Sequence, residues 1–442
     1  MTFPIHAAAE LSNGNRGRRE PLRIAGAGAV KARVLSTGGA ALAAERPARP
    51  GAAPPNTAHW GGVFAMTLCV FALIASEFMP VSLLTPIASA LQVSEGLAGQ
   101  GIAISGAFAV LTSLLISRVS RRVDRRTLLL SLTALMGVSG AVVGAADGYL
   151  AYMAGRALIG VVVGGFWSMS AATAMQLVPA ADVPRALAMF NGGNALATVV
   201  AAPVGSYLGA MIGWRGAFFF LVPIAAVAFV WQGFTLPSMP PRQGPLGSSS
   251  ILMLLKRRLV MFGTLAVGVF FMGQFALFTY LRPFLETVTR VDVSTLYLIL
   301  LALGVAGFVG TTAIGFFLKR VGLYETLAVI PVAMAAIAVA LVVVGASTAA
   351  TAVLLTVWGL FATAAPVGWW LWLARSLPDD ADAGGGLMVA VVQLSIALGS
   401  TLGGLLFDRS GHAATFAFSA GLLLTAAGLV FATSRAGRLR AA

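Results

Sequence analysis

The stretch LIASEFMPVSLLTP, residues 73–86, ends a run that is otherwise apolar from Val63 to Leu84. It carries one acid, Glu77, in a segment of membrane length, because a hydrocarbon core of about 30 Å needs roughly 20 apolar residues in a helix. Similar runs recur over residues 60–433. The chain has 58% hydrophobic and 10% charged residues and a mean hydropathy of +0.90, whereas soluble domains carry about 25% charged residues. The sequence therefore predicts an all-α polytopic membrane protein.

Hydropathy and segment length predict twelve membrane-spanning helices. They are expected at residues 61–88, 97–117, 127–146, 149–177, 186–210, 217–236, 259–282, 294–317, 325–346, 350–373, 386–406 and 412–433. The proline-rich segment 237–247 divides these spans six and six. The expected organisation is a disordered cytoplasmic tail at 1–59, an N-terminal six-helix half at 60–236, a cytoplasmic linker at 237–258, and a C-terminal half with a short tail at 259–442.

The lysines and arginines predict the orientation of the chain. With a cytoplasmic N-terminus, 24 of the 29 lie on the cytoplasmic side. Arg215, Arg282, Arg290 and Arg409 lie outside, and Arg156 lies within a span. This asymmetry follows the positive-inside rule, and an even number of spans returns the C-terminus to the cytoplasm. The charges are scattered over loops without interleaved aromatic residues, which disfavours nucleic-acid binding as the reason for the net charge of +14.

Two pairs of segments indicate that the halves are duplicated. SEFMPVSLLTP and GQFALFTYLRP place Glu77–Phe78 and Gln274–Phe275 nine residues before a proline, at an offset of 197 residues. SRVSRRVDRRTLLL from Ser117 and GFFLKRVGLYETLA from Gly315 follow the second helix of each half, at an offset of 198 residues. Repeated halves are common in transporters. The alternative is chance similarity between apolar segments of low complexity.

Glu77 is the one acid that the predicted spans place at membrane depth. A carboxylate there loses its hydration, and an ionisable residue inside a membrane commonly serves in proton transfer. Helix one enters near Val63, so Glu77 lies about 14 residues in, roughly 21 Å along the helix. Arg156 lies about 7 residues, roughly 10 Å, from the opposite surface, and therefore at a similar height. We predict that Glu77 and Arg156 couple transport to protons. The alternative is a permanent ion pair that only neutralises two buried charges.

Several motifs together resemble a known family. The basic loops after helices two and eight, GRALIGVVVGG at 155–165 and APVGSYLGAMIGWRGAFF at 202–219 resemble the major facilitator superfamily, specifically its drug:proton antiporter branch. SEFMPVSLLTPIA, LQVSEGLAGQ, GGFWSMSA, GQFALFTYLRP and APVGWWLWLARSL resemble the purine ribonucleoside efflux permeases of that branch, along nearly all of residues 60–433. The resemblance implies a secondary transporter of the bacterial inner membrane, not an enzyme, that exports inosine and guanosine in exchange for protons.

The loop motif of this family is degenerate in the present sequence. The motif, roughly Gly-x-x-x-Asp-x-x-Gly-Arg-Arg, has Arg121 in place of its acid and Asp124 in place of its second glycine. Helix five carries Ala202–Pro203 where antiporters often have Gly-Pro. The resemblance makes Asp124, Arg125 and Pro203 candidates for gating. Arg282, expected to cap the outer end of helix seven, is a further candidate.

A purine ribonucleoside needs aromatic stacking surfaces and polar partners for its ribose. Gln274 is the first candidate because it occupies the position of Glu77 in the second half. The other candidates are tryptophans of helices four and ten and uncharged polar residues on the spans: Trp167, Trp369, Trp370, Asn191, Asn194 and Gln393. The alternatives are an ordinary interfacial tryptophan belt and amides that only cross-link helices.

Other chemistries lack their motifs. None of the three lysines lies in a Gly-x-x-x-x-Gly-Lys phosphate loop, so ATP is not expected to be the direct energy source. The three histidines are dispersed and Cys69 is alone, which predicts neither a metal site nor a disulfide. We therefore expect no cofactor beyond the proton gradient and no obligatory protein partner. Efflux of drugs or sugars by the same fold, and a membrane-embedded enzyme or receptor, are the alternative functions.

Overall fold

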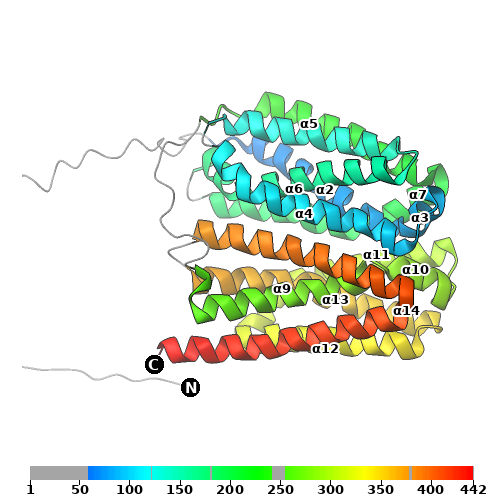
Figure 1. Cartoon of the computed structure of the whole chain (residues 1–442). Helices are drawn as coiled ribbons and strands as arrows, with labels where there is room; N and C mark the ends of the chain where they lie inside the picture. Colours follow the sequence, from blue (N-terminus) through cyan, green and yellow to red (C-terminus); the bar gives the residue numbers. More distant parts are fainter. Residues whose placement is uncertain (1–57, 121, 180–181, 241–253, 378–380, 442) are drawn as a thin grey trace, which may run out of the picture. The chain divides into compact units, whose positions relative to one another are not determined.

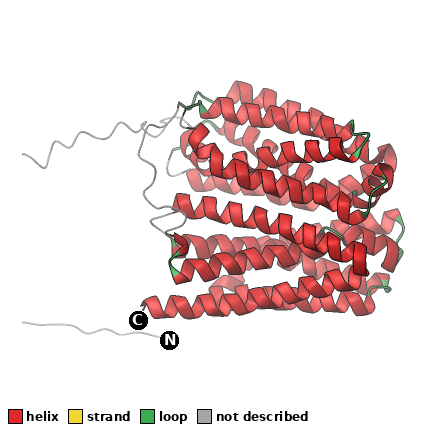
Figure 2. Ribbon diagram, viewed as in Figure 1, coloured by secondary structure: helices red, strands yellow, loops and turns green. Residues whose placement is uncertain are grey.

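The structure, a computed structural model, describes residues 58–120, 122–179, 182–240, 254–377 and 381–441. The predicted tail, except for residues 58–59, and most of the predicted linker lie outside these ranges. Figure 2 shows that helices make up nearly all of the described chain, and no strand occurs within it. The predicted all-α class is confirmed.

The first half contains α2 (Trp60–Ser82), α3 (Leu84–Leu91), α4 (Glu95–Val119), α5 (Arg125–Gly144), α6 (Tyr149–Leu177) and α7 (Val183–Thr235). The second half contains α9 (Arg258–Phe278), α10 (Leu281–Phe284), the short π-helix η1 (Leu285–Thr289), α11 (Val293–Arg320), α12 (Leu323–Val344), α13 (Thr348–Ser376) and α14 (Ala381–Ala441). Figure 1 shows the helices packed along one another, with α4 beside α14.

Ten helices of the described chain are long and apolar enough to cross a membrane. Two of them are double spans, because α7 and α14 each contain a residue with non-helical backbone angles. These residues are Gly213, at φ 76° and ψ 164°, and Gly411, at φ 75° and ψ −173°. Glycine adopts such positive φ angles without steric cost. The breaks fall between predicted spans, so the described residues hold twelve spans, as the sequence predicts.

The first helix of each half is broken near its C-terminal end. The predicted span 61–88 is divided in the structure, since α2 ends at Ser82 and α3 begins at Leu84. Pro80 lies inside α2 and has no N–H to donate to the carbonyl four residues earlier, which weakens the helix at this point. In the second half, the predicted span 259–282 is divided in the same way between α9 and α10.

Equivalent glycines pack in the same way within each half. A methyl group added to Gly160 of α6 would overlap the carbonyl oxygen of Ser105 on α4. A methyl group added to Gly359 of α13 would overlap the carbonyl oxygen of Leu303 on α11. The two glycines are 199 residues apart and the two carbonyls 198 residues apart. The matched contacts indicate that the sequence repeat is a repeat in structure.

The contacts between the halves also use equivalent glycines. A Cβ built at Gly106 of α4 would lie 2.7 Å from the carbonyl oxygen of Gln393 on α14. A Cβ built at Gly304 of α11 would lie 2.7 Å from the carbonyl oxygen of Val199 on α7. Small residues allow helix backbones to approach this closely inside a membrane. The two halves therefore meet along two related seams, α4 with α14 and α7 with α11.

Candidate functional site

Glu77 lies at the boundary between the halves. Its side chain, on α2, is only 5% exposed. The amide Nε2 of Gln393, on α14 of the other half, donates a hydrogen bond of 3.2 Å to Oε1 of Glu77. The sequence identifies both residues as candidates but does not pair them. The structure places Gln393 beside the carboxylate, and the hydrogen bond makes the environment of Glu77 dependent on how the two halves are arranged.

Arg156 binds the main chain next to Glu77. The guanidinium is fully buried and donates to the carbonyl oxygens of Gly101 at 3.0 Å, Ser76 at 2.8 Å and Glu77 at 3.1 Å. Because Pro80 has no N–H, the carbonyl of Ser76 has lost its helical partner. Arg156 supplies the missing donor, and it thereby holds the backbone of α2 where the helix is weakened.

The structure brings Glu77 and Arg156 together, as their predicted depths require, but not as an ion pair. The ion pairs among the described residues do not include these two side chains. The hydrogen bond that joins them ends on the main-chain oxygen of Glu77 and leaves its carboxylate to Gln393. The permanent ion pair considered from the sequence is therefore not the arrangement observed here. Proton coupling by the two residues stays a prediction.

Aromatic rings meet between the two repeated positions. The ring of Phe78, which follows Glu77, stacks on that of Phe275, which follows Gln274, with centroids 5.8 Å apart and an interplanar angle of 25°. The ring of Phe278 packs edge-on against both. Offset stacking and edge-on contacts are the favoured geometries for aromatic pairs. The repeated dipeptides of α2 and α9 therefore face each other across the boundary between the halves.

Gln274 is buried in the second half, with 8% of its surface exposed. Within the described residues, its side-chain oxygen Oε1 is buried and has no hydrogen-bond partner. Most buried polar atoms in proteins have a partner, so an exception calls for an explanation. Gln274 is the substrate candidate that retains an unused buried acceptor beside the boundary.

The tryptophan candidates differ in their surroundings. Trp167 is half-buried and packs edge-on against Phe166, its neighbour in sequence, at 6.1 Å. Trp369 is 2% exposed and packs edge-on against Trp372 at 6.0 Å, whereas Trp370 is 46% exposed. The structure does not bring these rings together into one stacking site. Their role in binding stays a prediction.

The two asparagine candidates make hydrogen bonds within their own helix. Asn191 is exposed, and its Nδ2 donates to the carbonyl of Leu187 at 2.9 Å. Asn194 is half-buried, and its main-chain oxygen accepts from the hydroxyl of Thr198 at 2.9 Å. These bonds join neither asparagine to Glu77, and both assignments stay predictions.

The helices α4 and α14 are joined by polar contacts at one end, which we call the outer end because the charge distribution predicts it to be external. Ser94 Oγ donates to Oδ2 of Asp408 at 2.5 Å, and the main-chain N–H of Gly96 donates to Oδ1 at 2.9 Å. Thr401 Oγ1 donates to Oε1 of Gln100 at 3.0 Å. Sequence reasoning missed this group, because Ser94 and Asp408 are 314 residues apart and no motif links them.

Arg282 joins the halves at the same end. Its side chain is 10% exposed, and its Nε forms an ion pair with Oε1 of Glu286 at 2.7 Å. Its Nη1 donates to the carbonyl oxygen of Ser82, at the end of α2 in the first half. This contact fits the predicted position of Arg282 at the end of helix seven. Its gating role stays a prediction.

Asp124 joins the start of α5 to the segment that follows α7. Its Oδ1 accepts from the N–H of Arg126 at 2.7 Å and caps α5. Its Oδ2 accepts from Ser238 Oγ at 2.6 Å and from the N–H of Met239 at 3.1 Å. Partial burial opposes ionisation, but the hydrogen bonds from Ser238 and from main-chain N–H groups outweigh it and hold the pKa of Asp124 below its usual value. These contacts hold the start of α5 against the segment after α7, and gating by Asp124 stays a prediction.

The other two gating candidates also lie within the first half. Nη1 of Arg125 donates to Oε1 of Gln176 at 3.0 Å, which ties the start of α5 to the end of α6. Pro203 is buried inside α7. A Cβ added at the nearby Gly205 would lie 2.6 Å from the hydroxyl of Ser82, so this part of α7 packs against the end of α2. Gating by Arg125 and Pro203 stays a prediction.

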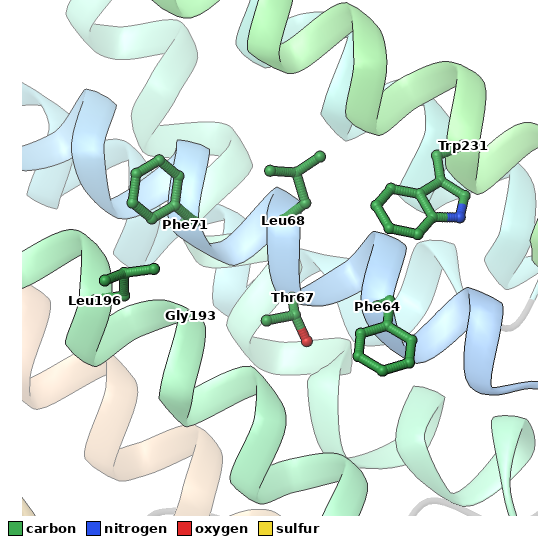
Figure 3. Close-up of a pocket in the computed structure, with 7 residues that line it drawn as sticks. All are labelled: Phe64, Thr67, Leu68, Phe71, Gly193, Leu196 and Trp231. Carbon is green, nitrogen blue, oxygen red and sulfur yellow. The ribbon is translucent and has the colours of Figure 1, made fainter.

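A groove on the first half offers little to a polar solute. Figure 3 shows its lining, formed by Phe64, Thr67, Leu68, Phe71, Gly193, Leu196 and Trp231, and its volume is about 310 Å³. Its one hydroxyl, that of Thr67, donates to the carbonyl of Val63 in the same helix. Binding sites for small polar molecules need a few convergent polar groups to fix orientation. The groove lacks such groups and is not the candidate site.

Twelve spans in two repeated halves, with a buried carboxylate where the halves meet, are the architecture of a membrane transporter. The sequence profile of the Major Facilitator Superfamily matches residues 66–399, and the chain belongs to this family. The resemblance noted from the sequence motifs is thereby confirmed. Membership makes the chain a multi-pass membrane transporter rather than an enzyme.

Two relatives match almost the whole chain. The transcription regulatory protein OpdE of Pseudomonas aeruginosa is 62% identical over 385 residues, which are 86% of this chain and 96% of that protein. The purine ribonucleoside efflux pump NepI of Salmonella typhimurium is 40% identical over 392 residues, 89% of this chain and 98% of NepI. The similarity to NepI is consistent with the permease resemblance noted from the motifs.

Solved structures show the same fold. A D-xylose–proton symporter superposes with a TM-score of 0.69 at 17% identity, covering 85% of this chain and 98% of the symporter. A bacterial homologue of the human lysosomal transporter Spinster, in an inward-facing conformation, gives a TM-score of 0.69 at 14% identity, covering 86% and 98%. At such low identity the likeness concerns the fold alone.

Proposed function

We propose that this protein is a proton-coupled antiporter that exports purine ribonucleosides such as inosine and guanosine. The observation that carries the proposal is the buried carboxylate of Glu77, hydrogen-bonded to Gln393 of the other half. The substrate class is supported by the 40% identity to a purine ribonucleoside efflux pump. The expected location is the bacterial inner membrane, with both termini in the cytoplasm.

Protonation of Glu77 changes the contact between the halves. The ionised carboxylate accepts a hydrogen bond from the side-chain N–H of Gln393. This charge-assisted hydrogen bond stabilises the arrangement in which the two side chains meet. The protonated form carries no charge, accepts more weakly and is less costly to bury. Binding of a proton therefore changes the free-energy difference between the arrangement in which the two side chains meet and the one in which they are apart. This change is what coupling of transport to protons requires.

The remaining contacts of the site fix the position of the carboxylate. Arg156 holds the α2 backbone at Ser76 and Glu77, so the carboxylate stays at the boundary while the halves move. At the outer end, Asp408 and Arg282 each join one half to the other. In the proposed cycle these bonds break when the outer end opens, the nucleoside leaves, and Glu77 takes up a proton. No cofactor is required, because the proton gradient supplies the energy.

Uptake by inverted membrane vesicles tests the proposed function. Inverted vesicles that contain the full chain should accumulate radiolabelled inosine when their interior is made acidic, and excess guanosine should compete. Vesicles without the protein are the control, and a sugar and a cationic drug added in excess test the alternative of broader efflux. Accumulation that is insensitive to purine nucleosides, or that does not depend on the proton gradient, contradicts the proposal.

A further inference from the structure

The unused acceptor of Gln274 distinguishes the two halves. Glu77 and Gln274 occupy equivalent positions, and the phenylalanines that follow them stack on each other. The Glu77 carboxylate has a protein partner, the amide of Gln393. Within the described residues the Oε1 atom of Gln274 is buried and has none. The repeated structure therefore provides a hydrogen bond at one of the two positions only.

The repeat also accounts for the missing partner. The two seams between the halves identify the residue of α7 that corresponds to Gln393. The carbonyl oxygen of Val199 of α7 meets Gly304 as the carbonyl oxygen of Gln393 meets the equivalent Gly106, so Val199 is the counterpart of Gln393. Val199 is half-buried, and its side chain ends in methyl groups, which are not hydrogen-bond donors. The first half thus lacks the side-chain amide with which the second half satisfies Glu77.

A buried carbonyl oxygen without a hydrogen bond costs free energy, because it has lost water and gained no donor. An apolar side chain of similar length at residue 274 avoids this cost. A polar group kept at such a cost is explained if a ligand supplies the donor. Gln274 lies beside the Phe78–Phe275 stack, at the counterpart of Glu77. A solute bound between the halves would reach Gln274 at this position.

We infer that Oε1 of Gln274 accepts a hydrogen bond from an N–H or O–H group of the transported nucleoside, and that Gln274 thereby selects solutes with a donor at that place. This inference rests on the proposed function and names one specificity-determining contact within it. A site built to hydrogen-bond a substrate group rejects analogues that lack the group, since a buried polar atom is then left unpaired.

A panel of inosine analogues, each lacking one donor, tests the inference. The analogues are 1-methylinosine, which lacks the N1 hydrogen, and the 2′-, 3′- and 5′-deoxy forms of inosine. Each competes with radiolabelled inosine for uptake by the full-length protein in vesicles. For the wild-type protein we expect one analogue to compete more weakly than inosine by about tenfold or more. In Gln274→Met, inosine itself should compete more weakly by a similar factor. The analogue that competes poorly in the wild type should then compete as well as inosine.

Gln232→Met is the matched control. Gln232 is a fully buried amide whose Oε1 accepts from Thr133 Oγ1 at 2.9 Å, so its acceptor oxygen, unlike that of Gln274, has a protein partner. This variant should keep the wild-type pattern of penalties. Gln274→Glu, which retains an acceptor oxygen, should keep that pattern as well. Ligand-induced thermal stabilisation of purified protein provides the same comparison without transport.

The outcomes separate this inference from the proposed function. If the wild-type protein neither transports nor binds inosine, both are wrong. If it transports inosine and Gln274→Met keeps every penalty of the wild type, the inference about Gln274 alone is wrong.

Discussion

The amide of Gln393 donates a hydrogen bond of 3.2 Å to the carboxylate of Glu77, and the two residues belong to different halves of the protein. The bond makes the state of one buried acid depend on the relative position of two six-helix units. Transport by alternating access moves such units against each other around a central site. The proposed function uses titration of Glu77 at this boundary to couple the movement to protons.

Loss of the Gln393 amide should weaken this coupling. Gln393→Met removes the donor and keeps the length of the side chain. Hydrogen bonds to charged groups contribute about 1.5–3 kcal/mol, so gradient-driven inosine uptake should fall by roughly tenfold or more. Initial uptake rates in inverted vesicles measure the effect. Ser395→Ala, two residues away and also buried, is the control and should change uptake little. Equal rates for Gln393→Met and wild type contradict the role given to this bond.

Substitutions of Arg156 and Pro80 should have effects on stability that are not additive. Arg156→Met leaves three main-chain carbonyls without their donor and should lower the melting temperature of the purified protein. Pro80→Ala restores the N–H that the Ser76 carbonyl lacks. Arg156→Met should therefore lower the melting temperature less in the Pro80→Ala background than in the wild type. Contacting residues typically couple by about 0.5–3 kcal/mol in such double-mutant cycles. Additive effects of the two substitutions show that Arg156 does not compensate for Pro80.

Asp408 should hold the outer end closed. Asp408→Ala removes the acceptor for Ser94 and Gly96 and should expose the neighbouring part of α4. A cysteine placed at Ala103, which is 8% exposed, should react with a maleimide about tenfold faster in this background. The native Cys69 is fully buried and should contribute little labelling. Asp147→Ala, which removes an exposed acid paired with Arg215, is the control. Equal labelling rates with and without Asp408 contradict this role.

The lowered pKa of Asp124 predicts a stability that depends on pH. A carboxyl whose pKa is lower in the folded state stabilises the protein above its unfolded pKa of about 3.9, and the contribution is lost as the pH falls through the lower folded value. Asp124→Ala should therefore destabilise the protein at pH 7, by about 0.5–2 kcal/mol from the lost helix cap. The difference from wild type should narrow below pH 4. Thermal unfolding in detergent between pH 3 and pH 7 measures it, and a difference that grows in acid contradicts the assignment.

Much of the fold could be predicted from the sequence because a membrane imposes simple rules on it. Membrane length fixed the number of spans, and the repeated Glu77–Phe78 and Gln274–Phe275 indicated the two halves. The break in the first span was missed, because Pro80 alone is compatible with an intact membrane helix when neighbours supply donors. Here the neighbour is Arg156, and its hydrogen bonds depend on three-dimensional packing.

Less of the candidate site could be predicted. Glu77 was identified because it is charged in an apolar segment, and Gln274 because it is its counterpart in the repeat. The partner of Glu77 was assigned to Arg156 by depth, but depth does not specify which atom an arginine binds. The contact between Ser94 and Asp408 joins residues in different halves, and hydropathy contains no information on such pairs. Adjacent Trp369 and Trp370 differ in exposure, which depends on helical phase that the apolar sequence leaves undefined.

Inosine transport by Glu77→Gln tests the central claim most directly. The glutamine keeps the shape of the side chain and cannot bind a proton at neutral pH. Inverted vesicles with an acidic interior should accumulate labelled inosine with the wild-type protein and not with Glu77→Gln. Exchange of labelled for unlabelled inosine, measured without a gradient, should persist in Glu77→Gln. This exchange would show that the variant is folded and binds inosine. Gradient-driven accumulation by Glu77→Gln at the wild-type level contradicts the account.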